Sequence, residues 1–157
     1  MIGKVVHKPD LIGEGKVYLI DEKDNIFLLL AAKKGILNKL FTSKYVLFDS
    51  GLKNIATIES VNLEMTVTYR FNIYDKKRIL IFKYIGGAWQ LTENGKVLFE
   101  VKDKNFSVKA ISDKKIEKVL AQFDFVKSNV LYRVHTLHDS ILVLMSLMLL
   151  FLLYIKE

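Results

Sequence analysis

The sequence predicts an all-β domain, a closed antiparallel barrel of about ten to twelve strands that encloses one hydrophobic C-terminal helix. Three observations predict it: strands with period-two alternation, a hairpin pattern that recurs along the chain, and an apolar run from Ile141 to Ile155 interrupted only by Ser146. The 157 residues are 51% hydrophobic with one proline, which excludes a disordered chain. We expect a single domain over 1–157, with strands over about 16–135 and the helix over about 138–156.

The strands follow from a repeated unit. A large residue is followed two places on by an aliphatic residue and four places on by an acid that opens a turn. The copies are Val17/Leu19/Asp21, Tyr45/Leu47/Asp49, Phe71/Ile73/Asp75 and Trp89/Leu91/Glu93, with a degenerate fifth at Phe106/Val108/Ala110. Apolar strands return over 26–30, 55–58, 78–84 and 96–101. Each full copy therefore predicts a β-hairpin whose acid bonds its own backbone in the turn.

The segments outside the repeat carry weaker patterns of their own. A short helix is expected over 33–41, a strand is favoured over a helix for 114–123, and the last strand is expected over 130–135. No strand is assigned to residues 1–10, where His7 is placed in a mobile terminus. So many strands curl and close, and closure removes exposed sheet edges. A barrel of this size needs apolar filling, which the helix supplies.

The apolar run has two readings. At about 1.5 Å per residue it is roughly 22 Å long, short of the ~30 Å hydrocarbon slab. Extending it back to Leu137 would immerse His138 and Asp139, which is costly in a membrane. A helix that is apolar all round also suits burial on every side by protein. A core helix is favoured, and a C-terminal tail anchor carrying a cytoplasmic β domain is the alternative.

The order of these elements resembles the tubby C-terminal-like superfamily, which includes tubby proteins, phospholipid scramblases and LURP-one-related proteins. The resemblance rests on consecutive hairpins, a final strand with Tyr132-Arg133-Val134, then Asp139 and the helix Ile141 to Ile155, and it is strongest for small bacterial-type members. It implies a twelve-stranded barrel threaded by the helix, and a role at membranes. Tubby domains bind phosphoinositide headgroups, but their headgroup residues have no one-to-one match here. Phosphoinositide specificity and calcium dependence are therefore not carried over.

Motifs for catalysis and metal binding are missing from the sequence. There is no cysteine, no glycine-rich phosphate loop and no carboxylate pair arranged for acid–base work. His135, His138, Asp139 and Ser140 are read as a solvated helix start, and Asp49, Asp75 and Glu93 as single turn acids without a ligand-dense loop. Trp89 is read as a core aromatic. We therefore expect no enzyme activity, no cofactor and no metal site.

The formal charge of +7 is the remaining functional lead. Basic residues that cluster along the chain are the candidate site for anionic phospholipid, and these are Lys33, Lys34, Lys39, Lys76, Lys77, Arg78, Lys114, Lys115 and Lys118. If the hairpin ends converge on one rim, these residues would form a patch that attracts anionic headgroups. Solvated turns are the simpler interpretation. Nucleic acid is an unlikely partner, because arginine is scarce and no nucleic-acid motif occurs.

These observations predict a non-catalytic, tubby-like binding or scaffold module. We expect it in the cytoplasm, since the N-terminus lacks a signal peptide, and peripheral at the membrane if the lysines bind lipid. A lipid-carrying barrel is a further alternative. It predicts a cavity, for which a central helix leaves little room.

Overall fold

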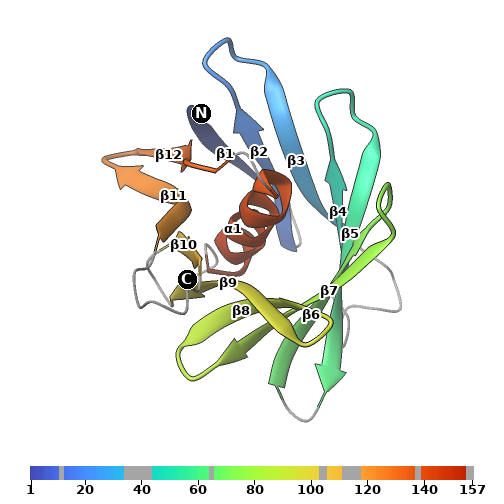
Figure 1. Cartoon of the computed structure of the whole chain (residues 1–157). Helices are drawn as coiled ribbons and strands as arrows, with labels where there is room; N and C mark the ends of the chain where they lie inside the picture. Colours follow the sequence, from blue (N-terminus) through green and yellow to red (C-terminus); the bar gives the residue numbers. More distant parts are fainter. Residues whose placement is uncertain are drawn as a thin grey trace.

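The computed structural model describes residues 1–10, 13–33, 44–63, 66–102, 106–110, 118–136 and 139–154. In this part of the chain, twelve antiparallel strands form a closed barrel around one helix, α1 (Figure 1). The predicted fold class is confirmed.

The elements follow one another without interruption by a second domain in the described residues. Their bounds are β1 Ile2–Asp10, β2 Gly13–Ile20, β3 Ile26–Lys33, β4 Lys44–Phe48, β5 Asn54–Leu63, β6 Thr66–Ile73, β7 Arg78–Ile85, β8 Ala88–Glu93, β9 Lys96–Lys102, β10 Ser107–Ala110, β11 Lys118–Val126, β12 Asn129–Val134 and α1 Ser140–Tyr154.

Each strand pairs with the next one in sequence, and β1 closes the barrel by pairing with β12. The register sets Ile2 against Arg133 and Val5 against Val130. Leaving residues 1–10 outside the sheet was therefore wrong. The alternation of β1 is hard to recognise because its inward positions are Gly3, Val5 and His7, of which only one is a typical core residue.

The hairpin repeat is confirmed, and it marks the even-numbered strands. The first two residues of each full copy point into the barrel, because strand side chains alternate between the two faces. Most of them are fully buried: Val17, Leu19, Tyr45, Leu47, Phe71 and Leu91, with Trp89 only 4% exposed. The period-two pattern therefore identified the core side of each hairpin, and Trp89 is a core aromatic as predicted.

Two of the repeated acids form their turns in the predicted way. Asp21 Oδ1 accepts hydrogen bonds from the backbone N–H groups of Lys23 and Asn25, both at 2.9 Å. Asp49 Oδ1 accepts them from Gly51 and Lys53, at 3.0 and 2.9 Å. These bonds hold the backbone of each turn while the carboxylate remains at the surface.

The helix α1 lies inside the barrel, as Figure 1 shows in a view along the barrel. Every residue from Leu142 to Leu152 is buried, so its apolar character on all sides matches its surroundings. Within the described residues, no helix has both the length and the hydropathy required to cross a bilayer. Residues 137–138 and 155–157 of the predicted helical range lie outside the described part of the chain.

The structure describes only part of the two connecting segments for which a helix and a strand were predicted, 33–41 and 114–123. Lys33 ends β3, and the rest of the helix expected over 33–41 lies outside the described residues. The strand favoured for 114–123 is present as β11 from Lys118, with 111–117 outside the described part.

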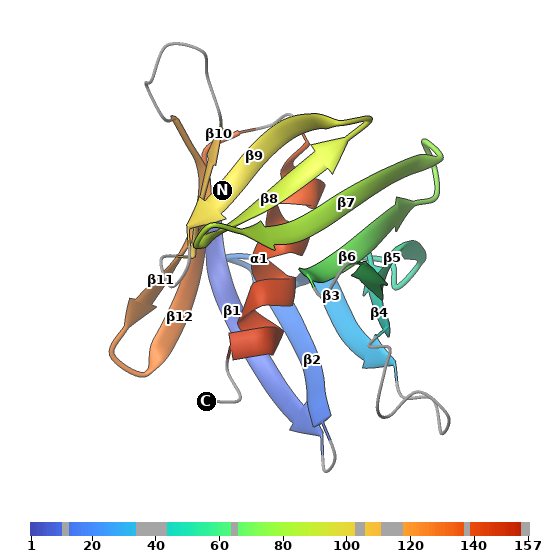
Figure 2. The same ribbon diagram turned by 90° about the horizontal axis from the view of Figure 1, so that it is seen from below.

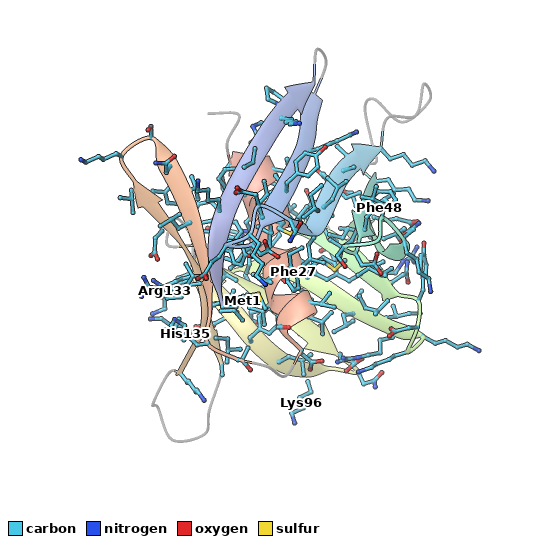
Figure 3. The ribbon with its side chains drawn as sticks, turned by 90° about the horizontal axis from the view of Figure 1, so that it is seen from above. Met1, Phe27, Phe48, Lys96, Arg133 and His135 are labelled. Atoms are coloured by element: carbon cyan, nitrogen blue, oxygen red, sulfur yellow. The ribbon has the colours of Figure 1, made fainter. Side chains whose placement is uncertain are left out.

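The two ends of the barrel are distinct, and we name them by the helix. The entry end is where α1 begins, and it also carries the turns that follow β2, β4, β6 and β8, because the strands alternate in direction. The far end is where α1 finishes, close to the tips of β1 and β2 in Figure 2. In Figure 3 Lys96 projects from the entry end, opposite those tips.

The helix runs off-centre in the barrel, closest to β2, β3, β10 and β11. The space toward the opposite wall is filled by large aromatic side chains, among them Tyr69, Phe71, Phe82 and Trp89. Phe82 stacks on Trp89 with ring centroids 5.0 Å apart, and the Trp89 Nε1–H donates to the Tyr154 hydroxyl at 2.9 Å. This hydrogen bond joins the last turn of α1 to β8.

Candidate functional site

Among the described members of the predicted basic site, Lys76, Lys77, Arg78 and Lys118 lie at the entry end of the barrel and Lys33 lies at the far end. Lys33 ends β3 at the far end. Lys76 and Lys77, in the turn between β6 and β7, and Lys118, at the start of β11, belong to the entry end. Lys34, Lys39, Lys114 and Lys115 lie outside the described residues. The described members of the candidate site are therefore divided between opposite ends.

Arg78 differs from the other candidates because its guanidinium is already paired. Its Nε and Nη2 donate to the two carboxylate oxygens of Glu93, each at 2.8 Å, and its Nη1 donates to Asp139 Oδ1 at 3.0 Å. The three side chains are only 21–25% exposed. Arg78 thus ties β7 and β8 to the residue that precedes α1, rather than standing free for a headgroup.

The same contacts change the titration of this cluster. The hydrogen bonds from Arg78 lower the pKa of Glu93 below its ordinary value, against the opposing effect of burial. Hydrogen bonding to Glu93, together with Asp139, raises the pKa of Arg78. Glu93 was predicted to bond its own turn, as Asp21 and Asp49 do. It instead points inward on β8 and meets Arg78, which is a difference that its longer side chain permits.

The far end carries exposed lysines that are scattered in sequence but close to the rim. They belong to β1, β2, β3, β9 and the turn between β11 and β12, and they are Lys8, Lys16, Lys33, Lys102 and Lys127. We call these five residues the far-end lysines. None of them forms an ion pair with another residue that the structure describes, and Lys8 Nζ lies 5.2 Å from the centre of the Tyr18 ring.

Three acids on the strands of this half of the barrel, Glu59, Glu100 and Asp124, are matched by basic side chains, while Asp10 and Glu14 belong to the β1–β2 hairpin. Glu59 pairs with Lys44 at 3.5 Å and with Arg70 at 2.8 Å, while Asp124 lies 3.9 Å from Arg133. Glu100 lies opposite Lys109 in the pairing of β9 with β10. The far-end lysines therefore leave an excess of positive charge near the rim.

Apolar side chains are exposed at the same end. They are Val67, Ile85, Phe125 and Val126, with 52%, 44%, 56% and 48% of their surface exposed. Phe125 stacks on Phe151 of α1, with ring centroids 6.3 Å apart and planes 19° apart, and it also meets Phe106 edge-on. The mouth of the barrel around the helix end is thus aromatic, and the far-end lysines lie along the part of its rim formed by β9 and by the strands from β11 round to β3.

The entry end has mixed charge instead. Acids occupy its turns beside lysines, and the described ones are Asp21, Glu22, Asp24, Asp49, Asp75 and Glu93. This follows from the repeat itself, because every acid-opened turn comes after an even-numbered strand and so lies at the same end.

Sequence reasoning missed four of the far-end lysines because it searched for runs of basic residues. Lys8, Lys16, Lys102 and Lys127 are isolated in sequence and meet only through strand order. Turns after odd-numbered strands lie at one end of the barrel and turns after even-numbered strands at the other. Counting acidic and basic residues separately for these two sets of turns would have shown that the two ends differ in charge.

A half-open cavity of about 640 Å³ lies at the entry end. It is bounded by the first turn of α1, the start of β5, the end of β6 and the start of β7. Its lining includes Ile55, Ala56, Ile73, Ile141 and Leu142, with Lys53 and Lys76 among its polar residues. A central helix was expected to leave little room, yet the off-centre course of α1 leaves this space on one side.

Among the described residues, no group of three or more His, Cys, Asp or Glu side chains could hold a metal ion. His135 is exposed, and His138 lies outside the described part. No family model matches the chain, and no curated protein or solved structure gives a match.

Proposed function

We propose that the protein is a non-catalytic binding module that associates peripherally with anionic phospholipid surfaces through its far end. The observation that carries the proposal is the combination of unpaired far-end lysines with exposed apolar side chains around the aromatic mouth. Lysines attract anionic headgroups at about 1 kcal/mol per residue near the surface. Exposed apolar side chains among them gain further free energy by entering the interface.

The arrangement of side chains supports this orientation over the reverse one. At the entry end, carboxylates lie beside the lysines and would repel an anionic surface. At the far end Glu59 and Glu100 are set against basic side chains, and Asp10 and Glu14 of the β1–β2 hairpin are outnumbered by the five far-end lysines. The proposal retains the expected cytoplasmic location and the likeness to tubby-like barrels, but it moves the lipid contact to Lys33 and four lysines outside the predicted clusters.

Vesicle binding tests the proposal. The purified protein is mixed with vesicles of phosphatidylcholine, with and without phosphatidylserine, and bound protein is measured by co-sedimentation at increasing salt. We expect binding that requires phosphatidylserine and weakens with salt. The test variant replaces the five far-end lysines with glutamine. Its affinity should fall at least about tenfold, since the loss of even two contacts of this size gives that factor.

The matched control replaces five exposed lysines elsewhere, Lys4, Lys23, Lys77, Lys96 and Lys118, with glutamine. It removes the same charge, so near-native binding by this control would show that location matters and not net charge. Equal loss in both variants, or greater loss in the control, would contradict a far-end contact. A folded protein that ignores anionic vesicles at low salt would end the lipid proposal altogether.

A second pair of variants tests the apolar contribution. Phe125→Ala should weaken vesicle binding several-fold because Phe125 is 56% exposed at the end of β11, next to the turn that carries Lys127. Ile79→Ala removes an equally exposed apolar side chain, 59% exposed, from the start of β7 at the entry end, and should leave binding unchanged.

A further inference from the structure

We propose that the entry-end cavity is a binding site for a single-chain amphipathic anion, an acyl chain that carries a carboxylate or phosphate headgroup. The cavity lies at the opposite end from the lipid-surface contact, so this inference does not depend on the proposed function. Its volume of about 640 Å³ falls within the ~300–1,000 Å³ of typical small-molecule sites.

The cavity exists because the inward-facing residues at this level are too small to reach the helix. Further along the barrel, Phe71 and Phe82 fill the space beside α1, with ring centroids 5.4 Å apart. At the entry end the corresponding wall carries Ala56 and Ile73, which leave the first turn of α1 partly uncovered. The space is thus left by small side chains of the wall, and the β4–β5 and β6–β7 turns border it.

The floor of the cavity is apolar and partly exposed. Ile141 is 39% exposed, whereas each of the next eleven residues of α1 is buried. Ten of those eleven residues are apolar. Tyr74, another lining residue, is 48% exposed. Together with Ile55 and Ile73 they present apolar surface to the cavity, and an acyl chain would remove this surface from water.

The charged residues of the lining favour an anionic headgroup. Two of the three lining aspartates are already engaged: Asp49 by the N–H groups of its own turn and Asp139 by Arg78. Lys53 and Lys76 are exposed and form no ion pair with another described residue, whereas Arg78, the third basic residue of the lining, is held by Glu93 and Asp139. The positive end of the α1 dipole adds to the potential of Lys53 and Lys76. The formal charges of the lining balance, with three basic and three acidic residues, so a carboxylate or phosphate at the mouth would be held by direct ion pairs with Lys53 and Lys76 and not by the net charge of the cavity.

Calorimetric titration of the full chain tests the site with dodecanoate and dodecyl phosphate, both below their micelle concentrations. We expect saturable one-to-one binding of at least one of them, and comparison of the two identifies the preferred headgroup. Dodecanol and dodecyltrimethylammonium carry the same chain without the negative charge, and they should bind at least about tenfold more weakly. Equal or stronger binding of either control ligand would overturn the proposal, as would the absence of saturable binding by both anions.

Two variants locate the binding. Lys53→Gln combined with Lys76→Gln should weaken binding of the anion about tenfold, while Lys23→Gln combined with Lys96→Gln, the matched control, should not. Ile141→Trp fills the cavity from a partly exposed position and should abolish binding with little change in thermal stability. Anion binding that survives both changes in folded protein would place the ligand elsewhere and refute this site. The Lys53/Lys76 variant should bind phosphatidylserine vesicles normally, so failure of either proposal can be recognised separately.

Discussion

Gly3 occupies a position in β1 where the backbone passes against the ring of Tyr132 in β12. A Cβ atom at Gly3 would lie 2.5 Å from two ring carbons of Tyr132 and 2.2 Å from the backbone oxygen of Ile20. Tyr132 is fully buried, and burial raises the pKa of its phenol. The ring cannot move outward to make room, because it is part of the packed core.

We therefore expect Gly3→Ala to reduce the free energy of unfolding by about 1–3 kcal/mol, the usual cost of overpacking. Gly51→Ala is the control, since its Cβ would meet only Asp49 Oδ1, at an ordinary 3.5 Å. Urea denaturation monitored by Trp89 fluorescence measures both. Equal stability of the two variants would show that the β1–β12 seam yields more easily than the structure implies.

The ion pair of Glu93 with Arg78 makes the stability of the fold depend on pH. The pKa of Glu93 is lowered in the folded state, so its stabilising effect is complete above the unfolded value of 4.5 and is lost as pH falls through the folded value. Glu93→Gln should cost about 1–2 kcal/mol near neutral pH, because Arg78 loses its paired carboxylate.

The measurement is the free energy of unfolding of both proteins at about pH 6 and about pH 3. The difference in the free energy of unfolding between the native protein and Glu93→Gln should be smaller at the lower pH. Glu22→Gln changes an exposed turn carboxylate and should follow the native protein throughout. A constant difference across this range would contradict the pairing of Glu93 with Arg78.

At the scale of elements, α1 is the part on which the barrel most depends. Residues from Leu142 to Leu152 are buried, and without them the barrel would contain a large apolar void. Deletion of residues 137–157 should abolish the cooperative unfolding transition seen by calorimetry. A soluble remainder with an intact transition would instead support the tail-anchor hypothesis.

A point substitution separates the loss of the helix from the loss of its packing. Leu147→Asp, at a fully buried position, should unfold the domain as deletion does, since an unpaired carboxylate in the core is very costly. Ile141→Asp on the same helix is 39% exposed and should be tolerated better.

The elements themselves were largely predictable from sequence, and the reasons are local. Alternation such as Phe71/Ile73 and turn residues such as Asn94-Gly95 fix a hairpin within a few residues, and both central turn residues indeed have positive φ, 51° and 80°. β1 escaped prediction because Gly3 and His7 face the interior without looking apolar. The fate of Glu93 was also out of reach, because its partner Arg78 lies on the neighbouring strand β7 and is itself positioned by Asp139, 61 residues further along the chain from Arg78.

At the scale of the whole molecule, the two proposed binding surfaces were the least predictable part. The far-end lysines come from five separate elements, and the cavity lining combines segments around residues 49–56, 73–78 and 139–142. No local pattern joins such residues, since closure of the sheet alone brings them together. The net charge of +7 predicted an anionic partner. Which end of the barrel carries the excess of basic residues could be known only from the order and direction of the strands.

The two proposals also fix an orientation. If the far end rests on a lipid surface, the entry-end cavity faces the surrounding water, because the two lie at opposite ends of the barrel. A ligand could then reach Lys53 and Lys76 without displacing the protein from the surface.

The seam between β1 and β12 has a consequence for synthesis on the ribosome. The first strand must wait for the last before the sheet can close, and α1 emerges after every strand that surrounds it. A growing chain therefore carries open sheet edges and an unfilled interior until its final turn of helix is made. Eleven of the twelve pairings between the described strands can form as the chain emerges, but closure of the barrel and burial of α1 come last, and open edges of this kind favour aggregation.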